Sequence, residues 1–389
     1  MKKTPNRNKK IACPLCKSIH TKVVYEADAL PLFQHKVFDS IGAAQKAKTG
    51  TVHLTVCQKC AFIFNGAFND ALMNYDKKYQ NEQGNSEYFR DYLKSVLALV
   101  KRSVRKSGTI IEVGCGKGLF LELMRKEGLD VKGFDPTYEG KDKDIIKDYF
   151  SEKYSGIRAD LIILRHTLEH IQSPFDFLKM IGRANNNKGK IFVEVPGFDW
   201  ISKKGAFWDI FHEHCNYFTE RSLASMFTRA KTGKLFNGQY IYVLADLADL
   251  KENVAKARTS IVEKETLGAE SVPKRIESYR EFLNGNKPIA IWGAGAKGST
   301  FVNLLDRAHK KVRFVIDLNP KKQHKYMGGT GHLILPPAEG LKRLKGESIL
   351  IMNENYLDEI KRDLAKRTGH KKIKIMSLGM LGDISKLTV

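Results

Sequence analysis

The sequence of 389 residues has no long apolar run, comparatively few acidic residues and only six cysteines. No stretch approaches the ~18 uninterrupted apolar residues of a membrane helix, which excludes an integral membrane protein. The basic N-terminus has no apolar segment behind it and is therefore not a secretory signal, so we expect a cytoplasmic protein. With 42% hydrophobic and 28% charged residues, the chain is too apolar for a disordered protein. At ~150 residues per domain, its length predicts two or three domains.

The shortage of acidic residues leaves a net charge of +23, from 66 Lys and Arg against 43 Asp and Glu. The excess is largest in residues 251–389, which contain 27 basic and 15 acidic residues. A solvated basic surface would account for this excess, and so would an acidic partner, either nucleic acid or a phosphate-bearing small molecule. Because the chain has no arginine-rich tail or basic–aromatic repeat, we expect the small molecule rather than nucleic acid.

Four of the six cysteines form two pairs with the same spacing, Cys13-x2-Cys16 and Cys57-x2-Cys60. Each pair can present two thiolates on a tight turn, and together they complete a tetrahedral shell for Zn²⁺. All four positions are then filled by sulfur and none is left for water, so this metal would be structural rather than catalytic. Disulfides are not expected in a reducing cytosol.

The middle of the chain has the pattern of a doubly wound α/β sheet. A helix is predicted over 72–105, and buried strands are predicted over 110–113, 131–134, 159–164 and 190–195. The first two strands enclose a turn with three glycines and a helix over 119–126. In such sheets ligands bind beyond the carboxyl ends of the strands.

The glycine turn reads E-V-G-C-G-K-G, and Asp135 follows seventeen residues after its last glycine. This pattern resembles motif I and the acidic motif of class I methyltransferases, which use S-adenosylmethionine (SAM). The run R-H-T-L-E-H after the third strand also resembles that superfamily. An acid at the end of the second strand can bind ribose hydroxyls. The cofactor site implied by the resemblance consists of Glu112, Gly114, Gly116, Gly118, Asp135, Pro136 and His166.

Other interpretations of these motifs stay open. The glycines can serve helix–strand packing alone, and the histidines of R-H-T-L-E-H can serve packing and capping at a helix start. A nicotinamide-binding turn normally reads G-x-G-x-x-G, whereas the third glycine comes one residue early here.

The segment Phe211-His212-Glu213-His214 follows the fourth strand and predicts a metal site, an acid–base site or two histidines packed in a loop. A metal site would favour spaced ligands such as H-E-x-x-H on one helical face. An acid–base site needs one imidazole with a near-neutral pKa, held by a carboxylate. On an extended segment alternate side chains share a face, so both imidazoles would point into one crevice.

A second glycine turn lies near the C-terminus. Helices are predicted over 250–286, followed by a strand over 288–292, the turn G-A-G-A-K-G, a helix over 300–305 and a strand over 312–316 that ends at Asp317. Taken alone, this is a dinucleotide fingerprint, which keeps NAD(P) as an alternative ligand. A glycine turn at a helix N-terminus, with Lys297 beside it, also suits a diphosphate.

In this order, the cysteine pairs, the SAM motifs, the H-E-H segment and the second glycine turn resemble the three-domain C-methyltransferases of nucleotide-linked deoxysugars. The resemblance covers nearly the whole chain. It implies an α/β protein with a zinc-binding lobe (1–72), a class I methyltransferase domain (73–245) and a C-terminal Rossmann-like domain for the nucleotide sugar (246–389). It implies that His214 is the base, with Glu213 and His212 beside it. The implied substrate residues are Gly293, Gly295, Lys297, Asp317 and Tyr217.

Phe211 stands where the family has a tyrosine, so a hydroxyl near the reacting keto group is absent. This predicts a shifted mechanism or a different substrate. The chemistry itself is coherent, because a carbon beside a ketone becomes nucleophilic once a positioned base removes its α-proton. SAM supplies the methyl group, so no catalytic metal is required. The rival functions are an RNA methyltransferase with a zinc knuckle and a nucleotide-binding or NAD(P)-dependent protein with a relict SAM fold. The sequence does not predict the sugar, the carbon, the nucleotide base or the oligomeric state.

Overall fold

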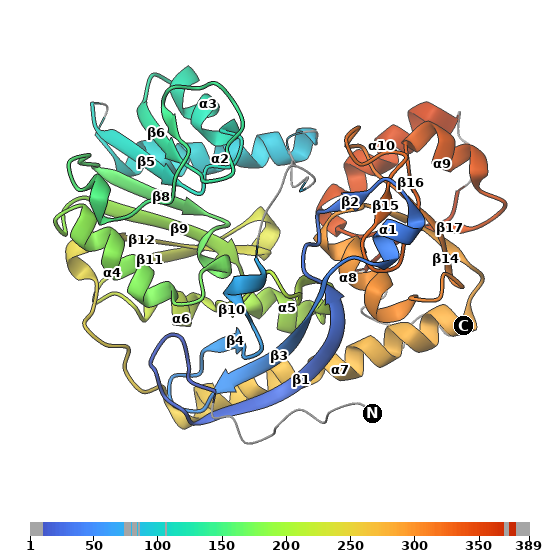
Figure 1. Ribbon diagram of the computed structural model, residues 1–389, viewed down its shortest axis with the longest axis horizontal. Coiled ribbons are helices and arrows are strands. Elements are labelled where there is room, and N and C mark those ends of the chain that lie inside the picture. The colour runs from blue at the N-terminus through green and yellow to red at the C-terminus, as the bar shows by residue number, and fades with distance from the viewer. Residues whose placement is uncertain are drawn as a thin grey trace.

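The computed structural model describes residues 11–73, 79, 84, 86–105, 107–368 and 373–378. Figure 1 shows an N-terminal sheet between a central lobe on the left and a C-terminal lobe on the right. Among the described residues, no helix combines the length and apolar character needed to cross a membrane.

The N-terminal sheet is antiparallel and takes its last strand from far along the chain. Its order is β1 (Thr21–Pro31), β3 (Thr49–Cys57), β4 (Ile63–Asn65) and β10 (Asn216–Tyr217). Val52, Leu54 and Val56 alternate along β3 and are fully buried, as expected for one face of a strand. The short strand β2 (Val37–Phe38) pairs with β15 (Tyr326–Met327) of the C-terminal lobe. The N-terminal sheet therefore contacts both other lobes.

The central sheet has seven strands and confirms the predicted doubly wound α/β fold. Its order is β11 (Lys231–Leu235), β12 (Tyr240–Asp246), β9 (Lys190–Pro196), β8 (Leu161–Arg165), β5 (Thr109–Val113), β6 (Asp130–Phe134) and β7 (Ile145–Ile146). Only β12 runs antiparallel to its neighbours within this sheet. The inner strands are largely apolar and buried because both sheet faces are covered.

The helices of the central lobe are α2 (Glu87–Ser103), α3 (Leu119–Lys126), α4 (Pro174–Ala184), α5 (Phe198–Lys204) and α6 (Glu220–Ala224). The helix predicted over 72–105 is shorter than expected. It begins at Glu87 because the side chain of Ser86 caps it by accepting the N–H of Phe89. Asp70–Leu72 instead forms a 3₁₀ turn, and residues 74–78, 80–83 and 85 lie outside the described part.

The C-terminal sheet is parallel throughout and confirms the predicted Rossmann-like fold. Its order is β16 (Ile334–Leu335), β14 (Val312–Ile316), β13 (Ile289–Trp292), β17 (Ser348–Ile351) and β18 (Ile375–Ser377). Its helices are α8 (Ala296–Leu305), α9 (Pro337–Arg343) and α10 (Leu357–Thr368). A Cβ at Gly298 would lie 2.1 Å from the carbonyl oxygen of Gly293, so only glycine lets α8 pack this closely on its strand.

One long helix joins the lobes. α7 (Thr259–Gly285) replaces the several helices predicted over 250–286, and it runs along the lower side of the molecule in Figure 1. Its apolar residues share one hydrophobic core with the N-terminal sheet, α5 and the C-terminal sheet. The domain boundaries at 72/73 and 245/246 stay a prediction.

Candidate active site

The first glycine turn lies at the carboxyl end of β5. Gly114, Gly116 and Gly118 have φ values of 77°, 55° and 83°, a backbone conformation that favours glycine. A Cβ at Gly114 would lie 2.3 Å from the hydroxyl of Thr167, so this glycine allows the loop after β8 to approach. A Cβ at Gly116 would meet nothing within 4 Å. The turn therefore exposes its backbone to open space at Gly116, where a ligand can approach closely.

Asp135 follows β6 and holds the same turn. Its Oδ2 accepts the N–H of Gly116 at 2.8 Å, and its Oδ1 accepts the N–H and the hydroxyl of Thr137 at 2.8 and 2.6 Å. A carboxylate oxygen can accept more than one hydrogen bond, so these contacts leave capacity for a ligand. Contacts of Asp135 and the adjacent Pro136 with a ribose stay a prediction.

Glu112, on β5 just before the turn, is 3% exposed, and burial raises its pKa to about 7. Its Oε2 has no hydrogen-bond partner among the described residues. A buried acceptor without a partner is unfavourable, and the amino group of a bound ligand would satisfy it. The open turn at Gly116 and the unsatisfied Glu112 fit SAM.

A buried ion network lies behind the turn. Arg165 donates from Nε to Glu194 Oε2 at 2.9 Å, and Tyr92 donates its hydroxyl to the other oxygen of that carboxylate. His166 Nε2 lies 3.0 Å from Glu194 Oε1, and His166 Nδ1 lies 3.5 Å from Glu169. Burial opposes a charge on His166, but these two carboxylates raise its pKa to about 9. His166 is therefore cationic at neutral pH, and its contact with a cofactor stays a prediction.

The H-E-H segment is a turn rather than a strand, so its two imidazoles diverge. His212 is 1% exposed and donates from Nδ1 to the carbonyl of Thr51 at 3.0 Å. Glu213 accepts the backbone N–H of Gln34 at 2.6 Å. Both partners belong to the N-terminal lobe, which therefore anchors the turn. The expectation that both imidazoles share a crevice is wrong because the segment is not extended.

His214 points instead toward the loop after β8. Its ring centroid lies 4.9 Å from that of His170 and 4.1 Å from that of Phe211. Ligating atoms of Glu169, His170 and His214 all lie within 4.8 Å of one another. His170 Nδ1 lies 2.9 Å from the carbonyl oxygen of Glu213 and donates to it, so its Nε2 keeps a lone pair.

Burial holds the pKa of His214 well below its usual range, and electrostatic interactions with neighbouring basic groups, including His166 and Lys297, act in the same direction. His214 is therefore a neutral imidazole that can accept a proton. Carboxylate and imidazole also bind divalent metals, so a metal interpretation applies to this cluster rather than to His212.

Sequence reasoning missed Glu169 and His170 as neighbours of His214. The run R-H-T-L-E-H already indicated that the loop after the third predicted strand contains functional residues. However, nothing in the spacing links residues 169 and 170 with residue 214, because only the tertiary fold brings them together.

The four cysteines of the two pairs lie together. The sulfur atoms of Cys13 and Cys60 are 3.6 Å apart, as are those of Cys16 and Cys57. With Zn–S bonds of about 2.3 Å, tetrahedral geometry places sulfurs about 3.8 Å apart. Hydrogen bonding with Cys13 lowers the pKa of Cys16 to about 7. The donor set therefore fits Zn²⁺.

The second glycine turn lies at the carboxyl end of β13. Asp317 accepts the N–H of Ala294 at 2.6 Å and that of Asn319 at 2.8 Å. Lys297 forms a buried ion pair with Asp209 and lies over the Trp200 ring, 4.6 Å from its centroid. Gly293 and Gly295 shape the turn, with a φ of 120° at Gly293. The predicted substrate contacts of these residues stay a prediction.

Tyr217 is 3% exposed, and its hydroxyl donates to the carbonyl of Phe211 at 3.2 Å. This bond restrains the backbone at the start of the H-E-H turn. A substrate contact by Tyr217, predicted from the sequence, is not tested by this arrangement.

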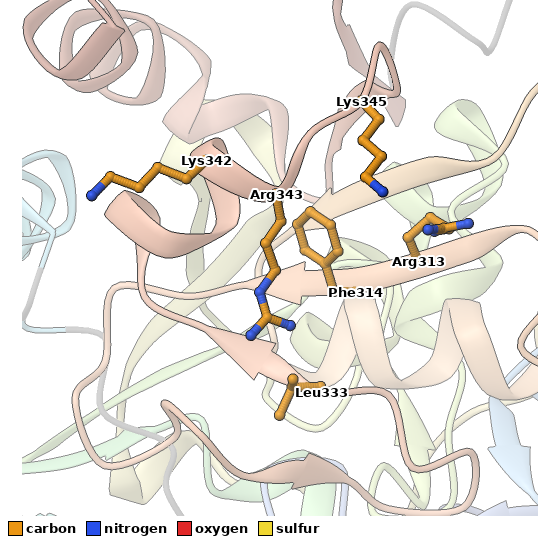
Figure 2. Close-up of a pocket in the computed structure, with 6 residues that line it drawn as sticks. All are labelled: Arg313, Phe314, Leu333, Lys342, Arg343 and Lys345. Carbon is orange, nitrogen blue, oxygen red and sulfur yellow. The ribbon is translucent and has the colours of Figure 1, made fainter.

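A separate surface cavity of about 420 Å³ lies on the C-terminal lobe. Figure 2 shows its lining residues, Arg313, Phe314, Leu333, Lys342, Arg343 and Lys345. Arg313 lies near the start of β14 and Lys345 precedes β17. The cavity therefore lies toward the amino ends of parallel strands, away from the glycine turn at their carboxyl ends.

Two family models match the chain. Residues 85–231 match a methyltransferase domain, and residues 271–376 match a C-methyltransferase C-terminal domain. C-methyltransferase NovU from Streptomyces niveus is 26% identical over 284 residues, which cover 64% of this chain and 67% of NovU. Ubiquinone biosynthesis O-methyltransferase from Escherichia coli O127:H6 is 26% identical over 114 residues, which cover 25% of this chain and 45% of that protein. The crystal structure of PH0226 protein from Pyrococcus horikoshii OT3 covers 44% of this chain and 99% of its own, with 14% identity and a TM-score of 0.34.

The central sheet, its glycine turn and the first family match define a class I SAM-dependent methyltransferase. The match of residues 271–376 to a C-methyltransferase domain and the similarity to NovU indicate, within this class, a methyltransferase that acts on carbon. Together, the two family matches and the similarity to NovU support a SAM-dependent C-methyltransferase of the NovU type.

Proposed function

We propose that this protein transfers the methyl group of SAM to the carbon beside the keto group of a nucleotide-linked deoxysugar. The family match at residues 271–376 supports transfer to carbon. The basic excess in residues 251–389 supports a substrate that carries phosphate. A cytoplasmic location belongs to the same proposal.

The observation that carries the proposal is the placement of His214. This neutral imidazole lies with Glu169 and His170 in a cluster within 4.8 Å. The loop of Glu169 and His170 also contacts the first glycine turn, because Thr167 packs on Gly114 and donates to the carbonyl of Val113 at 3.2 Å. A base therefore stands beside the place proposed for the methyl donor.

In the proposed reaction SAM supplies an electrophilic methyl group when bound. His214 accepts the α-proton at its unprotonated ring nitrogen, and the carboxylate of Glu169 stabilises the imidazolium that forms. The ring of Phe211 packs on His214 and offers no hydroxyl. We therefore expect the donor for the enolate oxygen to come from another residue, which is the shift in mechanism predicted from the sequence.

The two glycine turns and the cysteine cluster would each bind a different group in this proposal. Glu112, Gly116 and Asp135 would hold SAM at the first glycine turn, and the second turn would face the nucleotide sugar. Cys13, Cys16, Cys57 and Cys60 would hold one structural Zn²⁺.

Methyl transfer from SAM with a ¹³C-labelled methyl group tests this proposal. The purified protein is incubated with nucleotide-linked 4-keto-deoxysugars and, separately, with transfer and ribosomal RNA. NMR of the products then identifies the atom that carries the label. We expect a label on a sugar carbon, and none with His214→Asn. A label on oxygen, nitrogen or RNA contradicts the proposal.

A further inference from the structure

The helix α2 of the central lobe is capped by a carboxylate from the C-terminal lobe. Glu359, in the first turn of α10, accepts the backbone N–H groups of Glu87 and Tyr88 at 3.1 and 3.3 Å. It also accepts the hydroxyl of Ser86 at 2.5 Å, although the two residues are 273 positions apart in the chain. The first N–H groups of a helix have no partner within the helix, so an acid at this end is stabilising. The C-terminal lobe therefore holds the start of α2.

The same segment of the C-terminal lobe holds a strained turn between β11 and β12. Phe236 and Asn237 of this turn have φ values of 49° and 55°, a backbone conformation that is costly for a bulky residue such as Phe236. Asn355, shortly before α10, donates to the carbonyl of Phe236 at 3.3 Å and accepts from the side-chain amide of Asn237 at 3.1 Å. Strain of this kind persists only where surrounding contacts hold it, and it is concentrated at functional sites.

One turn into α2, Tyr92 contacts the buried ion network behind the first glycine turn. Its hydroxyl donates to Glu194, the carboxylate that also contacts His166. Thr167 follows this histidine in the chain and packs on Gly114 of the first glycine turn. The capped end of α2 is therefore connected with the cofactor turn through about one helical turn and one buried carboxylate.

The ring of Tyr92 is held by other aromatic rings. Its centroid lies 4.8 Å from that of Phe236 and 5.8 Å from that of Tyr240. Tyr356 of the C-terminal lobe packs edge-on against Phe236, with centroids 5.9 Å apart. Contacts from the C-terminal lobe thus hold both the backbone of α2 and the ring that this helix places on the ion network.

We propose that Glu359 is a positioning residue for the cofactor site. By capping α2, it holds Tyr92 on Glu194 and keeps the first glycine turn in the conformation that binds SAM. The affinity for SAM then depends on the docking of the C-terminal lobe, which gives this lobe a role besides facing the substrate. The effect on SAM rests on the cofactor site proposed above, but it requires neither the sugar nor the base.

Calorimetry with S-adenosylhomocysteine (SAH) on the full chain tests this proposal. Glu359→Ala should weaken SAH binding at least about fivefold, the lower end of typical coupling between separate sites. Glu359→Gln keeps an acceptor oxygen for the N–H groups of α2 and should recover much of the affinity. Asp358→Ala is the matched control, because Asp358 is the exposed neighbour in the same helical turn, and it should change affinity about twofold at most. Equal SAH affinities of the wild type and Glu359→Ala would overturn the proposal.

A double-mutant cycle tests whether the cap acts through Tyr92. Tyr92→Phe removes the hydroxyl from Glu194 and should also weaken SAH binding. Adding Glu359→Ala to this variant should cost less affinity than the same change costs in the wild type, because the two residues act on one contact. Losses that simply add would show that the cap does not act through Tyr92 and would contradict the proposal.

Hydrogen exchange and thermal unfolding separate positioning from a general loss of stability. In Glu359→Ala the first turn of α2 should exchange faster, whereas the strands of the central sheet should keep their protection. A lower melting temperature with unchanged SAH affinity would make Glu359 a purely structural residue and overturn the proposal. A wild type that binds no SAH would refute the proposed cofactor site together with this inference. Unchanged affinity in Glu359→Ala, with a wild type that binds SAH, would refute this inference alone.

Discussion

At the scale of single residues, two buried carboxylates determine which histidine of the site carries a charge. His166 lies beside Glu169 and Glu194, which raise its pKa to about 9, whereas burial lowers the pKa of His214. One imidazole is thus an ion-pair partner and the other a proton acceptor, although both are half-buried in the same lobe. This division is the reason to assign the base role to His214.

The charge on His166 predicts a pH dependence of stability. Its native pKa of about 9 lies above the usual 6.5, so its contribution is complete below about pH 6.5 and is lost as the pH rises through 9. His166→Gln should therefore be less stable than the wild type by on the order of 1–3 kcal/mol at pH 6.5. The difference should shrink toward pH 10. Urea unfolding at several pH values measures it, and a difference that grows with pH would contradict the assignment.

Asp135 gives a second prediction at this scale. Removing a charged hydrogen-bond acceptor costs on the order of 1.5–3 kcal/mol, so Asp135→Ala should weaken SAM binding roughly tenfold to a hundredfold. Asp130 begins the same strand at its opposite end, so Asp130→Ala is the control and should leave affinity within twofold. Calorimetry measures both variants, and SAM binding that survives Asp135→Ala unchanged would remove Asp135 from the cofactor site.

Single residues also show which features of the site could be predicted from the sequence and which could not. The cysteine pairs and the turn from Gly114 to Gly118 follow from local spacing, because each motif is contained in a few residues. The ion pair of Lys297 with Asp209 and the cluster around His214 join residues more than forty positions apart. No local pattern encodes such contacts, so the sequence predicted a free phosphate ligand at Lys297 and two imidazoles on one face.

At the scale of elements, the strands were predictable because short, largely apolar segments such as Leu161–Arg165 and Ile289–Trp292 are typical of a sheet with both faces covered. The strand β10 was not, since two residues carry no periodicity. It nevertheless helps to position the H-E-H turn, because its pairing with β4 acts together with the contacts of His212 and Glu213 with the N-terminal lobe.

Because the N-terminal lobe holds the H-E-H turn in place, a small change in β3 should reduce methyl transfer. A Cβ at Gly50 would lie 2.5 Å from Nδ1 of His212, so Gly50→Ala should push the H-E-H turn out of place. Small misplacements can cost ~100-fold in rate, so we expect at least a tenfold loss of methyl transfer with SAM affinity unchanged. Gly42→Ala is the matched control, because its Cβ would meet nothing within 4 Å. Equal activity of the two variants would contradict the anchoring role.

At the scale of the whole molecule, the N-terminal sheet connects the cysteine cluster directly with the candidate active site. Cys57 ends β3 and Cys60 precedes β4, whose pairing with β10 fixes the turn of His214. Arg221 of α6 also donates to the carbonyl of Cys60 at 2.9 Å. If these cysteines bind zinc as proposed, its loss should displace the H-E-H turn and leave the first glycine turn intact.

The corresponding experiment removes the metal. Elemental analysis should find about one zinc per chain, and Cys57→Ser should lose the zinc, melt at a lower temperature and lose most methyl transfer. Cys215→Ser is a control, since Cys215 lies outside the cluster and should retain the zinc. A Cys57→Ser protein that retains both its zinc and its stability would refute a structural zinc site.

The central claim is that His214 removes an α-proton, and deuterium exchange tests it without methyl transfer. A nucleotide-linked keto-sugar that the enzyme methylates is incubated with the protein in heavy water without SAM, and NMR follows loss of the α-proton signal. The wild type should catalyse this exchange, and His214→Asn should slow it roughly 100- to 10,000-fold while SAM still binds. His212→Asn should have a smaller effect. Full exchange by His214→Asn, with His212→Asn inactive, would contradict the account.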